Sequence, residues 1–484
     1  MVIGIDLGTS GVKVVLLNAD GGLLASHSAP LDVSRPRPLW SEQDPESWWR
    51  ATDQAMCGLA QQHDLSGVRA IGLSGQMHGA TLLDADGGTI RPAILWNDGR
   101  SAAQCAALEE AVPDARAITG NLMMPGFTAP KLLWLKEHEP QHFARIARVL
   151  LPKDWLRWRM TGEFASDMSD AAGTLWLNVA QRDWSEPLLA ACGLTRAQMP
   201  RLVEGNAFTG RLSAALAARW GIGEVPLVAG GGDNAAGAIG VGLTEPGQAM
   251  LSLGTSGVYF VVSDGFASNP QRAVHSFCHA LPGRWHLMSV MLSAASCLDW
   301  AARLTGCADV AALLAEAERA SDDRPLPLFL PYLSGERTPH NNPAASGVFF
   351  GLTHQHGRPE LARAVLEGVS FALAEGMDAV HACGARPESI RLIGGGARSE
   401  LWRQMLADVS GQTLDYVEGG EVGPALGAAQ LARMALNPDV PLADLLPALP
   451  LLQRHRPDAA RHQAYQPQRA RFAQLYQQLE SLMH

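Results

Sequence analysis

The chain has 484 residues, of which 47% are apolar and 18% are charged, a composition typical of a folded globular protein and not of a disordered or fibrous one. Its formal net charge of −10 gives no general attraction to nucleic acids or acidic membranes, so a small anionic ligand would need local cations or a metal ion. The seven cysteines form no Cys-x-x-Cys pair and have no zinc-finger spacing, which indicates reduced, mostly structural thiols.

The chain starts with a β-prone apolar run that carries Asp6, and this start lacks the cationic segment and cleavage site of a secretory signal peptide. No apolar run approaches the length that spans a bilayer. We therefore expect a cytoplasmic protein that has neither membranes nor nucleic acids as partners.

A polar turn at residues 8–12, with the sequence Gly-Thr-Ser-Gly-Val, lies between apolar runs at residues 1–5 and 12–17. This pattern predicts a strand, a turn and a second strand. Glycines let the backbone come close to a ligand, and the Thr and Ser hydroxyls add donors, so the turn suits an anion such as phosphate. For one such turn taken alone, ordinary hairpin chemistry is the alternative.

The predicted strand at residues 68–73 runs into a loop that carries Met77 and His78. In α/β sheets, loops at strand ends are where ligands bind. The alternative for this pair is a core methionine beside a hydrogen-bonded histidine.

A second strand end, at residues 94–96, leads into Trp96, Asp98 and Arg100. The indole ring of Trp96 is suited to stack on the apolar face of a sugar, with plain core packing as the alternative. Asp98 and Arg100 also fit a local ion pair.

Helices are predicted from residue 45 to about residue 60, after an N-cap at Asp44, and after a proline-containing loop within residues 121–136. The polar residues at 153–155 and 166–170 are interpreted as surface loops, the second of them as a helix cap.

The stretch from residue 225 to 237 is a predicted strand, three consecutive glycines, Asp233, Asn234 and an Ala/Gly-rich helix. The glycines remove every side chain before Asp233, so a substrate can approach the backbone there, and the helix aims its N-terminus at the same place. A helix N-cap is the alternative role for Asp233.

The turn sequence of residues 8–12 returns unchanged at residues 254–258, again between apolar runs. The offset is close to half of the chain, so two large halves are favoured over the three domains that length alone suggests. We expect an N-terminal domain at residues 1–244 and a C-terminal domain at residues 245–484.

Further along the second half, residues 331–339 form a turn-rich loop and residues 359–382 a predicted helix. The strand at residues 390–393 enters the loop Gly-Gly-Gly-Ala-Arg-Ser, and a helix follows directly, which is typical of a phosphate or adenosine cradle. From residue 453 onward we expect a polar, solvated helix.

The chain contains no Gly-x-x-x-x-Gly-Lys-Ser/Thr motif, which excludes a P-loop nucleotide site. Two anion-binding turns, a glycine loop and two carboxylates are sufficient for phosphoryl transfer, which depends on positioning and charge neutralisation. Asp6 is suited to a magnesium ion, directly or through its waters. Asp233 is suited to act as the general base, with a pKa raised by its cleft.

Residues 1 to about 435 resemble the FGGY carbohydrate kinases through the two turns, the Gly-Gly-Gly-Asp-Asn segment, the loop at residue 394, and residues 124–135 and 347–367. Within that family, residues 76–79 resemble the bacterial members that phosphorylate D-xylulose, whereas members acting on glycerol carry an Arg-Glu pair there.

The resemblance implies an α/β fold with two actin-like, ribonuclease H-like domains of the hexokinase-like ATPase superfamily around a cleft. It implies that the domain at residues 1–244 binds the sugar and that the domain at residues 245–484 binds the nucleotide. It also implies ATP-dependent phosphorylation of D-xylulose to D-xylulose 5-phosphate in xylose catabolism, with Mg²⁺, and a homodimer. The family's proton acceptor matches Asp233, and its metal-associated aspartate matches Asp6. The matching sugar positions are Met77, His78, Asp233 and Asn234, with Trp96 as a wall, and the nucleotide positions are Thr9, Lys13, Gly254, Thr255, Gly395 and Gly396.

Three alternatives stay open at this point. Lys13 could point to solvent from its strand. Another sugar, such as ribulose, gluconate or glycerol, could be the acceptor, although Met77 and His78 disfavour glycerol. An actin-like chaperone or filament ATPase could reuse the phosphate turns without a sugar site, but the Asp233 segment disfavours it.

Overall fold

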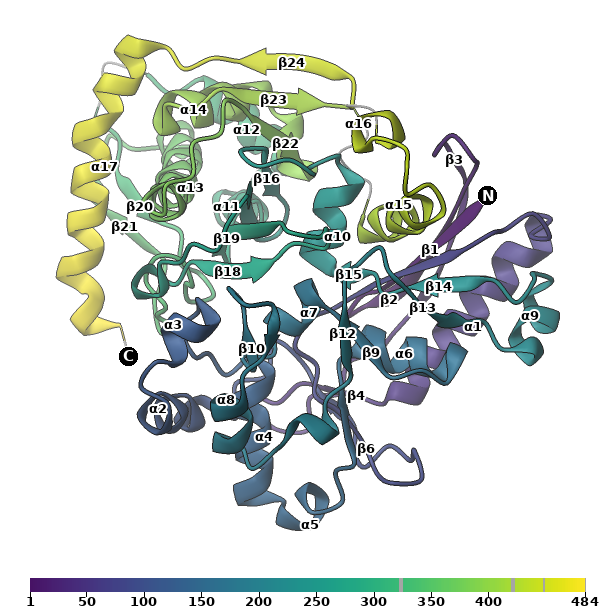
Figure 1. The fold of residues 1–484 in the computed structure, drawn as a ribbon. Helices are drawn as coiled ribbons and strands as arrows, with labels where there is room; N and C mark the ends of the chain where they lie inside the picture. Colours follow the sequence, from purple (N-terminus) through teal and green to yellow (C-terminus); the bar gives the residue numbers. More distant parts are fainter. Residues whose placement is uncertain (322–324, 419–422, 447–448, 484) are drawn as a thin grey trace.

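The computed structural model describes residues 1–321, 325–418, 423–446 and 449–483, and its two α/β halves are each built on a seven-stranded sheet (Figure 1). The first sheet contains β1 (Val2–Leu7), β2 (Gly11–Leu17), β3 (Leu23–Pro30), β5 (Ile71–Gly75), β13 (Phe208–Arg211), β14 (Pro226–Val228) and β15 (Gly231–Gly232). The second contains β16 (Ala249–Leu253), β17 (Gly257–Ser263), β18 (His275–Cys278), β19 (Trp285–Met291), β22 (Ile390–Ile393), β23 (Leu414–Val417) and β24 (Leu451–His455).

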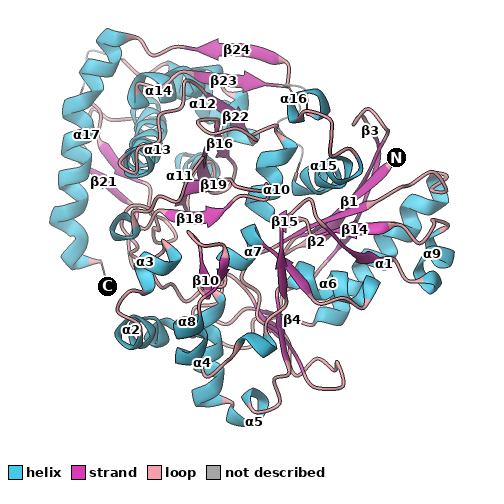
Figure 2. Cartoon of the chain, viewed as in Figure 1, coloured by secondary structure: helices cyan, strands magenta, loops and turns pink. Residues whose placement is uncertain are grey.

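Helices surround both sheets, and short strand pairs lie outside them (Figure 2). The helices of the first half are α1 (Pro45–Gln62), α2 (Ala102–Ala111), α3 (Ala115–Thr119), α4 (Thr128–His138), α5 (Pro140–Phe143), α6 (Pro152–Thr161), α7 (Met168–Ala172), α8 (Glu186–Ala191), α9 (Ala214–Trp220) and α10 (Asp233–Gly240). Those of the second half are α11 (Ser296–Thr305), α12 (Val310–Glu318), α13 (Arg358–His381), α14 (Glu400–Ser410), α15 (Pro424–Leu436), α16 (Leu442–Leu445) and α17 (Ala459–Leu479). The short pairs are β4 (Glu42–Gln43) with β7 (Ala93–Ile94), β6 (Thr81–Leu83) with β8 (Arg148–Leu150), β9 (Ala165–Asp167) with β12 (Arg201–Val203), β10 (Leu177–Asn178) with β11 (Asp183–Trp184), and β20 (Leu328–Leu330) with β21 (Val348–Phe350).

The two large sheets share one topology. In the first sheet, β1, β2 and β3 form an antiparallel meander, β5 pairs parallel with β1, β14 pairs parallel with β5, and β13 closes the edge antiparallel. In the second sheet, β16, β17 and β19 repeat the meander, β22 and β23 add in parallel, and β24 closes antiparallel. The repeated turn therefore marks a repeat of the whole sheet.

The late helix α15 packs on the first sheet, beside β1 at the N-terminus (Figure 1). The contact is so close that a Cβ atom added to Gly4 would lie 1.9 Å from the Ala425 carbonyl oxygen, and one added to Gly72 would lie 1.8 Å from that of Ala428. Only glycine permits this approach. Helix α15 therefore belongs in sequence to the predicted C-terminal domain, residues 245–484, but packs on the sheet of the predicted N-terminal domain, residues 1–244.

Several predicted elements are confirmed. Helix α1 begins after Asp44, whose side chain accepts a hydrogen bond from the Glu46 amide, and α13 covers almost the whole predicted span. The strand predicted at residues 68–73 is shorter at its start, because β5 begins at Ile71.

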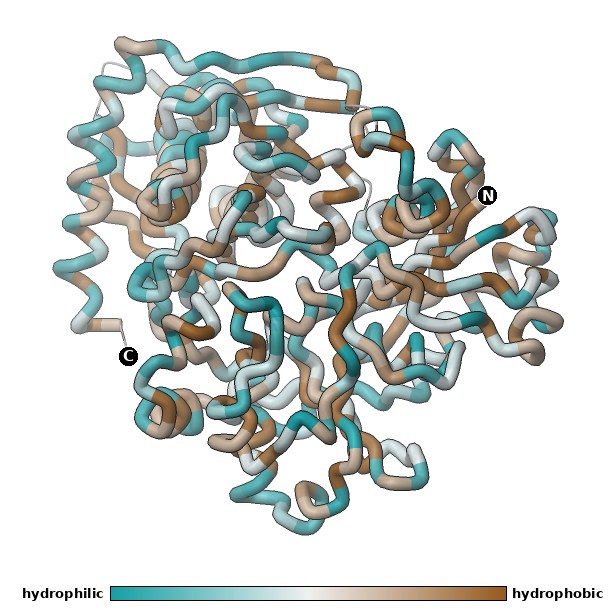
Figure 3. Tube along the Cα trace, in the orientation of Figure 1, coloured by the Kyte–Doolittle hydropathy of each residue, from teal (hydrophilic) through white to brown (hydrophobic). Residues whose placement is uncertain are grey.

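The prediction for the C-terminal segment is wrong in part. Residues 451–455 form β24, and the helix begins only at Ala459. Helix α17 lies along the outside of the second half and is largely hydrophilic (Figures 1 and 3), but it buries Phe472, Leu475 and Tyr476 against the core. Among the described residues, no helix is long and apolar enough to cross a membrane.

Candidate active site

Three parallel strands of the first sheet end side by side and carry the predicted sugar and catalytic residues. Asp6 on β1 pairs with Ser74 on β5, and Gly232 on β15 pairs with Gly75 on the other side of β5. The carboxyl ends of parallel strands form the ligand-binding edge of an α/β sheet. Asp6, the loop that carries Met77 and His78, and Asp233 therefore meet at one edge, as the sequence predicted.

Asp233 is the first residue of α10, and Gly232 is the N-cap, so a capping role for Asp233 is wrong. Its Oδ1 atom accepts hydrogen bonds from the backbone amide of Asn234 at 2.7 Å and from the Asn234 side-chain amide at 2.9 Å. Within the described part of the chain, Oδ2 has no hydrogen-bond partner. Burial raises the pKa of Asp233 to about 6, while the Asn234 bonds oppose that rise, so the group is mostly ionised at neutral pH.

Asp6 accepts a hydrogen bond of 3.1 Å from the Ser74 hydroxyl. Burial and the charge of Asp233 raise the pKa of Asp6 to about 7, and Lys13 opposes the rise. Lys13 is the cross-strand partner of Asp6, so both side chains lie on the same face of the sheet. Lys13 is partly buried on this face, and its contact with a nucleotide stays a prediction.

The first turn is linked to Trp96 by a chain of hydrogen bonds. The indole Nε1 of Trp96 donates to the Thr9 hydroxyl at 2.9 Å, and that hydroxyl donates to Gln76 at 2.9 Å. Gln76 in turn donates to Gln43, whose own amide donates to the Thr9 carbonyl oxygen. Thr9 thus fixes the indole ring of Trp96 and has its hydroxyl engaged with protein groups, while the role of Trp96 as a sugar wall stays a prediction.

His78 has a left-handed backbone, with a φ of 68°, which a non-glycine residue adopts only when its surroundings hold it there. Its Nδ1 lies 2.6 Å from the carbonyl oxygen of Gly173. Its own carbonyl oxygen accepts from Lys131 Nζ at 2.9 Å and from the Thr128 hydroxyl at 3.1 Å, and its ring packs edge-on against Phe127.

The protonation of His78 follows from these contacts. A carbonyl oxygen can only accept, so Nδ1 carries the hydrogen. Burial and the nearby charge of Lys131 hold the pKa of His78 well below its usual range, so the ring is neutral. Nε2 is then the acceptor of the ring.

Lys131 was not predicted as a site residue, although it lies in a stretch singled out by the family resemblance. It is fully buried and donates to the carbonyl oxygens of Gly126 and His78 instead of to a carboxylate. Burial holds its pKa well below the usual range. Lys131 therefore fixes the backbone of the two loops that carry Gly126 and His78.

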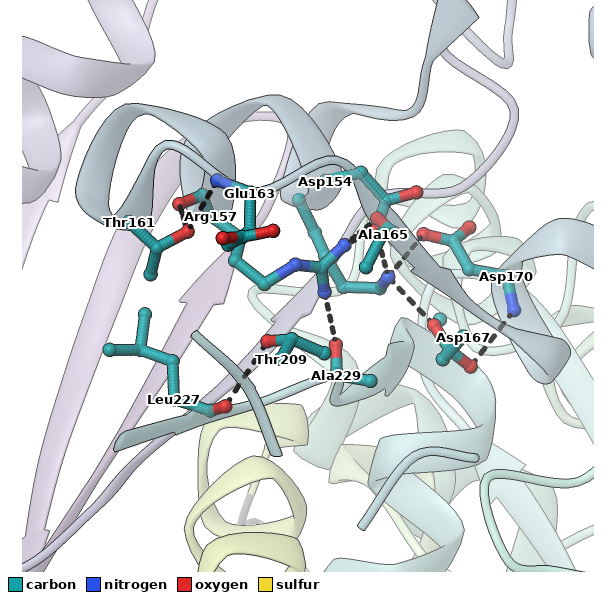
Figure 4. A network of polar contacts seen from close by, with 12 residues as sticks. Asp154, Arg157, Thr161, Glu163, Ala165, Asp167, Asp170, Thr209, Leu227 and Ala229 are labelled. Carbon is teal, nitrogen blue, oxygen red and sulfur yellow. Dashed lines mark hydrogen bonds and ion pairs between the residues drawn. The ribbon is translucent and has the colours of Figure 1, made fainter. Parts of the chain in front are cut away.

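The surface-loop interpretation of residues 153–155 and 166–170 is wrong. Lys153, Asp154, Arg157, Asp167 and Asp170 are buried and form one network of ion pairs. Figure 4 labels Asp154, Arg157, Asp167 and Asp170. Lys153 Nζ lies 2.7 Å from carboxylate oxygens of Asp154 and Asp167 and 3.3 Å from Asp170, and Arg157 lies 2.7 Å from Asp154. Their charges pair with one another inside the fold, which local polarity could not show.

This network reaches the loop before Asp233 by two hydrogen bonds. Arg157 donates to the Ala229 carbonyl oxygen at 2.9 Å, and the Ser169 hydroxyl, which itself donates to Asp167, accepts from the Gly232 amide at 3.1 Å. The predicted cap is confirmed, because Asp167 caps α7. The ion-pair network therefore holds the backbone of the glycine segment before Asp233 in place.

Asp98 and Arg100 form the local ion pair that was the alternative reading. Arg100 contacts Asp98 and Glu42, both at 2.7 Å, and its guanidinium lies 3.6 Å from the ring centre of Trp40. These contacts keep the Arg100 charge paired within the first half.

A cavity of about 310 Å³ lies between the halves. Asp233, Asn234 and Gly237 line it from the first half, and Met250, Ser252, Val258, Ile393, Gly394, Gly423 and Pro424 line it from the second. Ser252 and Ile393 are partners in adjacent parallel strands, so the Gly254–Thr255 turn and the Gly395–Gly396 loop continue from neighbouring strand ends. None of the six predicted nucleotide residues is among the described residues that line this cavity; four are close neighbours in sequence.

Asp6 and Asp233 fit the site of a magnesium ion that also binds substrate phosphates. Asp6 lies close enough to Asp233 for the second charge to raise the pKa of the first, and a cation would relieve this repulsion. Within the described residues, no cluster of three or more His, Cys, Asp or Glu side chains could hold a metal alone. Magnesium normally takes one or two carboxylates and completes its shell with water and substrate phosphates.

Duplicated sheets of this topology, with facing carboxylates at the strand ends of one half and a glycine loop in the other, are typical of two-domain α/β kinases. Models of the FGGY family of carbohydrate kinases match this chain, the N-terminal domain at residues 1–240 and the C-terminal domain at residues 249–436. The chain belongs to the FGGY family of carbohydrate kinases, which confirms the predicted family and fold class.

Individual relatives agree over the full length. A xylulose kinase from Escherichia coli is 68% identical over 483 residues, which cover 100% of both chains. A solved structure of a xyloylose kinase from Brucella ovis has a TM-score of 0.94 and 46% identity over 99% of each chain. A gluconate kinase from Lactobacillus acidophilus has a TM-score of 0.92 and 26% identity, over 99% of this chain and 98% of its own.

Proposed function

We propose that the protein transfers the γ-phosphoryl group of ATP to a hydroxyl of D-xylulose and forms D-xylulose 5-phosphate, a step of xylose catabolism. The full-length relative at 68% identity, named a xylulose kinase, supports this substrate. The observation that carries the mechanism is the carboxylate of Asp233, mostly ionised, beside a cavity between the halves, with one oxygen that has no hydrogen-bond partner among the described residues.

The sugar is held at the strand ends of the first half. The Nε2 atom of neutral His78 accepts a hydrogen bond from a sugar hydroxyl, and Asn234, already hydrogen-bonded to Asp233, offers its amide oxygen. Met77 and Trp96 supply apolar surface for the carbon chain. Because the indole ring is fixed by Thr9, this wall is preorganised.

In the chemical step, Oδ2 of Asp233 takes the proton of the acceptor hydroxyl while that oxygen attacks the γ-phosphorus in line. The new O–P bond forms as the bond from phosphorus to the β–γ bridging oxygen breaks, and ADP leaves with that electron pair. A general base of this kind contributes about 10² to 10⁴ in rate. Magnesium, when bound near Asp6, would neutralise phosphate charge.

The nucleotide is proposed to lie between the repeated turns. Gly254, Thr255, Gly395 and Gly396 follow the ends of β16 and β22, and Lys13 lies on the Asp6 face of the first sheet. Their backbone amides and the lysine charge suit the phosphates of ATP. A cytoplasmic location agrees with the use of ATP, and the homodimer stays a prediction.

The test is to couple ADP release to a panel of ketoses, polyols and aldonates. D-xylulose should give the highest kcat/KM. If D-xylulose gave no more turnover than buffer while gluconate, ribulose or glycerol did, the substrate assignment would be wrong and the kinase assignment would stand.

A further inference from the structure

The loop at residues 331–339 belongs to the second half, but one of its side chains reaches the sugar wall of the first. The guanidinium carbon of Arg337 lies 5.8 Å from the ring centre of Trp96. A Cβ atom added to Gly126 would lie 3.8 Å from Arg337 Nη2 and 2.3 Å from the Trp96 carbonyl oxygen. The guanidinium therefore lies beside the first-half loops that carry Trp96 and Gly126.

The backbone that carries Arg337 is firmly anchored. The Arg337 amide donates to the Glu336 carboxylate at 2.7 Å, and the same oxygen accepts from the Leu292 amide at 3.1 Å. Thr338 exchanges two hydrogen bonds of 3.1 Å with Val290 at the end of β19. The side chain thus extends from a fixed point, which lowers the entropy lost when it binds a ligand.

Among the described residues, no carboxylate forms an ion pair with the guanidinium of Arg337. Within the described residues, its guanidinium nitrogens have no hydrogen-bond or ion-pair partner, although the side chain is partly buried. Its nearest carboxylate, Glu336, uses one oxygen for backbone amides, and burial raises the pKa of Glu336 to about 8, so that group is mostly neutral.

The other titratable groups near the guanidinium do not supply negative charge either. The Arg337 charge is among the causes that lower the pKa of His78, His275 and Lys131, which places the guanidinium near all three. Both histidines are neutral. The guanidinium is partly exposed, so its N–H donors are available to a ligand of complementary chemistry.

We propose that Arg337 is a substrate-positioning residue that donates hydrogen bonds across the cleft to oxygen atoms of the open-chain sugar bound against Trp96 and His78. The planar guanidinium presents several N–H donors in a fixed geometry that matches adjacent hydroxyl or carbonyl oxygens. The proposal rests on the proposed function, because it requires a polyhydroxylated acceptor in this place. It makes the sugar site a product of both halves.

The experiment compares R337M and R337K with the wild-type enzyme, and R386M serves as the control, because Arg386 is exposed and, within the described ranges, donates to backbone carbonyl oxygens alone. Removing a charged donor should lower kcat/KM for D-xylulose by about 10- to 100-fold in R337M, through a higher sugar KM. The KM for ATP and the slow hydrolysis of ATP without sugar should change less than about twofold. R337K, which keeps the charge, should recover part of the loss.

A merely structural role would give a different result. If the guanidinium only packed on Trp96, R337M would lower the thermal midpoint without a selective rise in the sugar KM, and that outcome would overturn the proposal. If R337M failed to fold, R337K would decide, since a wild-type sugar KM in that variant contradicts positioning by the guanidinium. Should the wild-type enzyme turn over another sugar instead of D-xylulose, the same comparison is made with that sugar, so the two proposals fail separately.

Discussion

Asp6 at the end of β1 and Asp233 directly after β15 lie at the same edge of the sheet, with β5 between their strands, and the charge of Asp233 adds to burial in raising the pKa of Asp6 to about 7. Two ionised carboxylates at this separation repel one another, and the repulsion is relieved when one of them takes a proton or a cation binds between them. The site is therefore prepared for a proton and a cation, which phosphoryl transfer to a hydroxyl provides.

The first prediction concerns the base. D233N keeps the shape of the side chain but cannot take a proton, so turnover of D-xylulose should fall by about two orders of magnitude or more. Binding of ATP, measured by calorimetry, should stay near normal. Near-wild-type turnover in this variant would remove Asp233 from the base role.

The second prediction concerns pH. Asp233 acts as a base only when ionised, and its pKa is raised to about 6 by burial. The value of kcat/KM for the sugar should therefore fall about tenfold for each pH unit below about 6 and level off above that value. A profile that is flat between about pH 5 and about pH 8 would contradict this assignment.

The third prediction tests the support of His78. A Cβ atom added to Gly173 would lie 2.6 Å from the His78 ring and 2.8 Å from the Met77 methyl group, while the Gly173 backbone has an ordinary φ of −75°. G173A should displace both side chains and raise the sugar KM by about tenfold or more, with an unchanged KM for ATP.

The matched control is G265A, because a Cβ atom at Gly265 meets nothing within 4 Å. This variant should keep both KM values. Equal sugar KM values in G173A and G265A would show that the contact with Gly173 does not position His78.

The fourth prediction concerns the buried ion pairs. K153M would leave Asp154 and Asp167 without their central cation, and breaking such a buried network costs about 3–5 kcal/mol. Asp170 lies farther from Lys153, at 3.3 Å, and burial raises its pKa well above the usual range. D170N should therefore lose much less stability than K153M in urea unfolding monitored by fluorescence. Equal losses would show that the contact of Asp170 with Lys153 contributes as much as the shorter contacts of Asp154 and Asp167.

The sequence predicted those parts of the site that are local. Asp233 follows three glycines and His78 follows a buried strand, so strand-end logic found both. Lys153 and Asp167 were placed on the surface because each sits in a polar stretch, and their pairing depends on packing between segments fourteen positions apart. Arg337 could not be assigned to the sugar wall because its approach to Trp96 depends on how the halves are docked.

The helix that covers one face of the first sheet comes late in the sequence. Helix α15 begins at Pro424, yet it seals the face of β1 and β5 formed by Gly4 and Gly72. During synthesis this face of the first sheet therefore stays uncovered until nearly two hundred further residues have been made. We expect a fragment of residues 1–244 to bind a hydrophobic dye strongly and a separately added α15 peptide to suppress that binding.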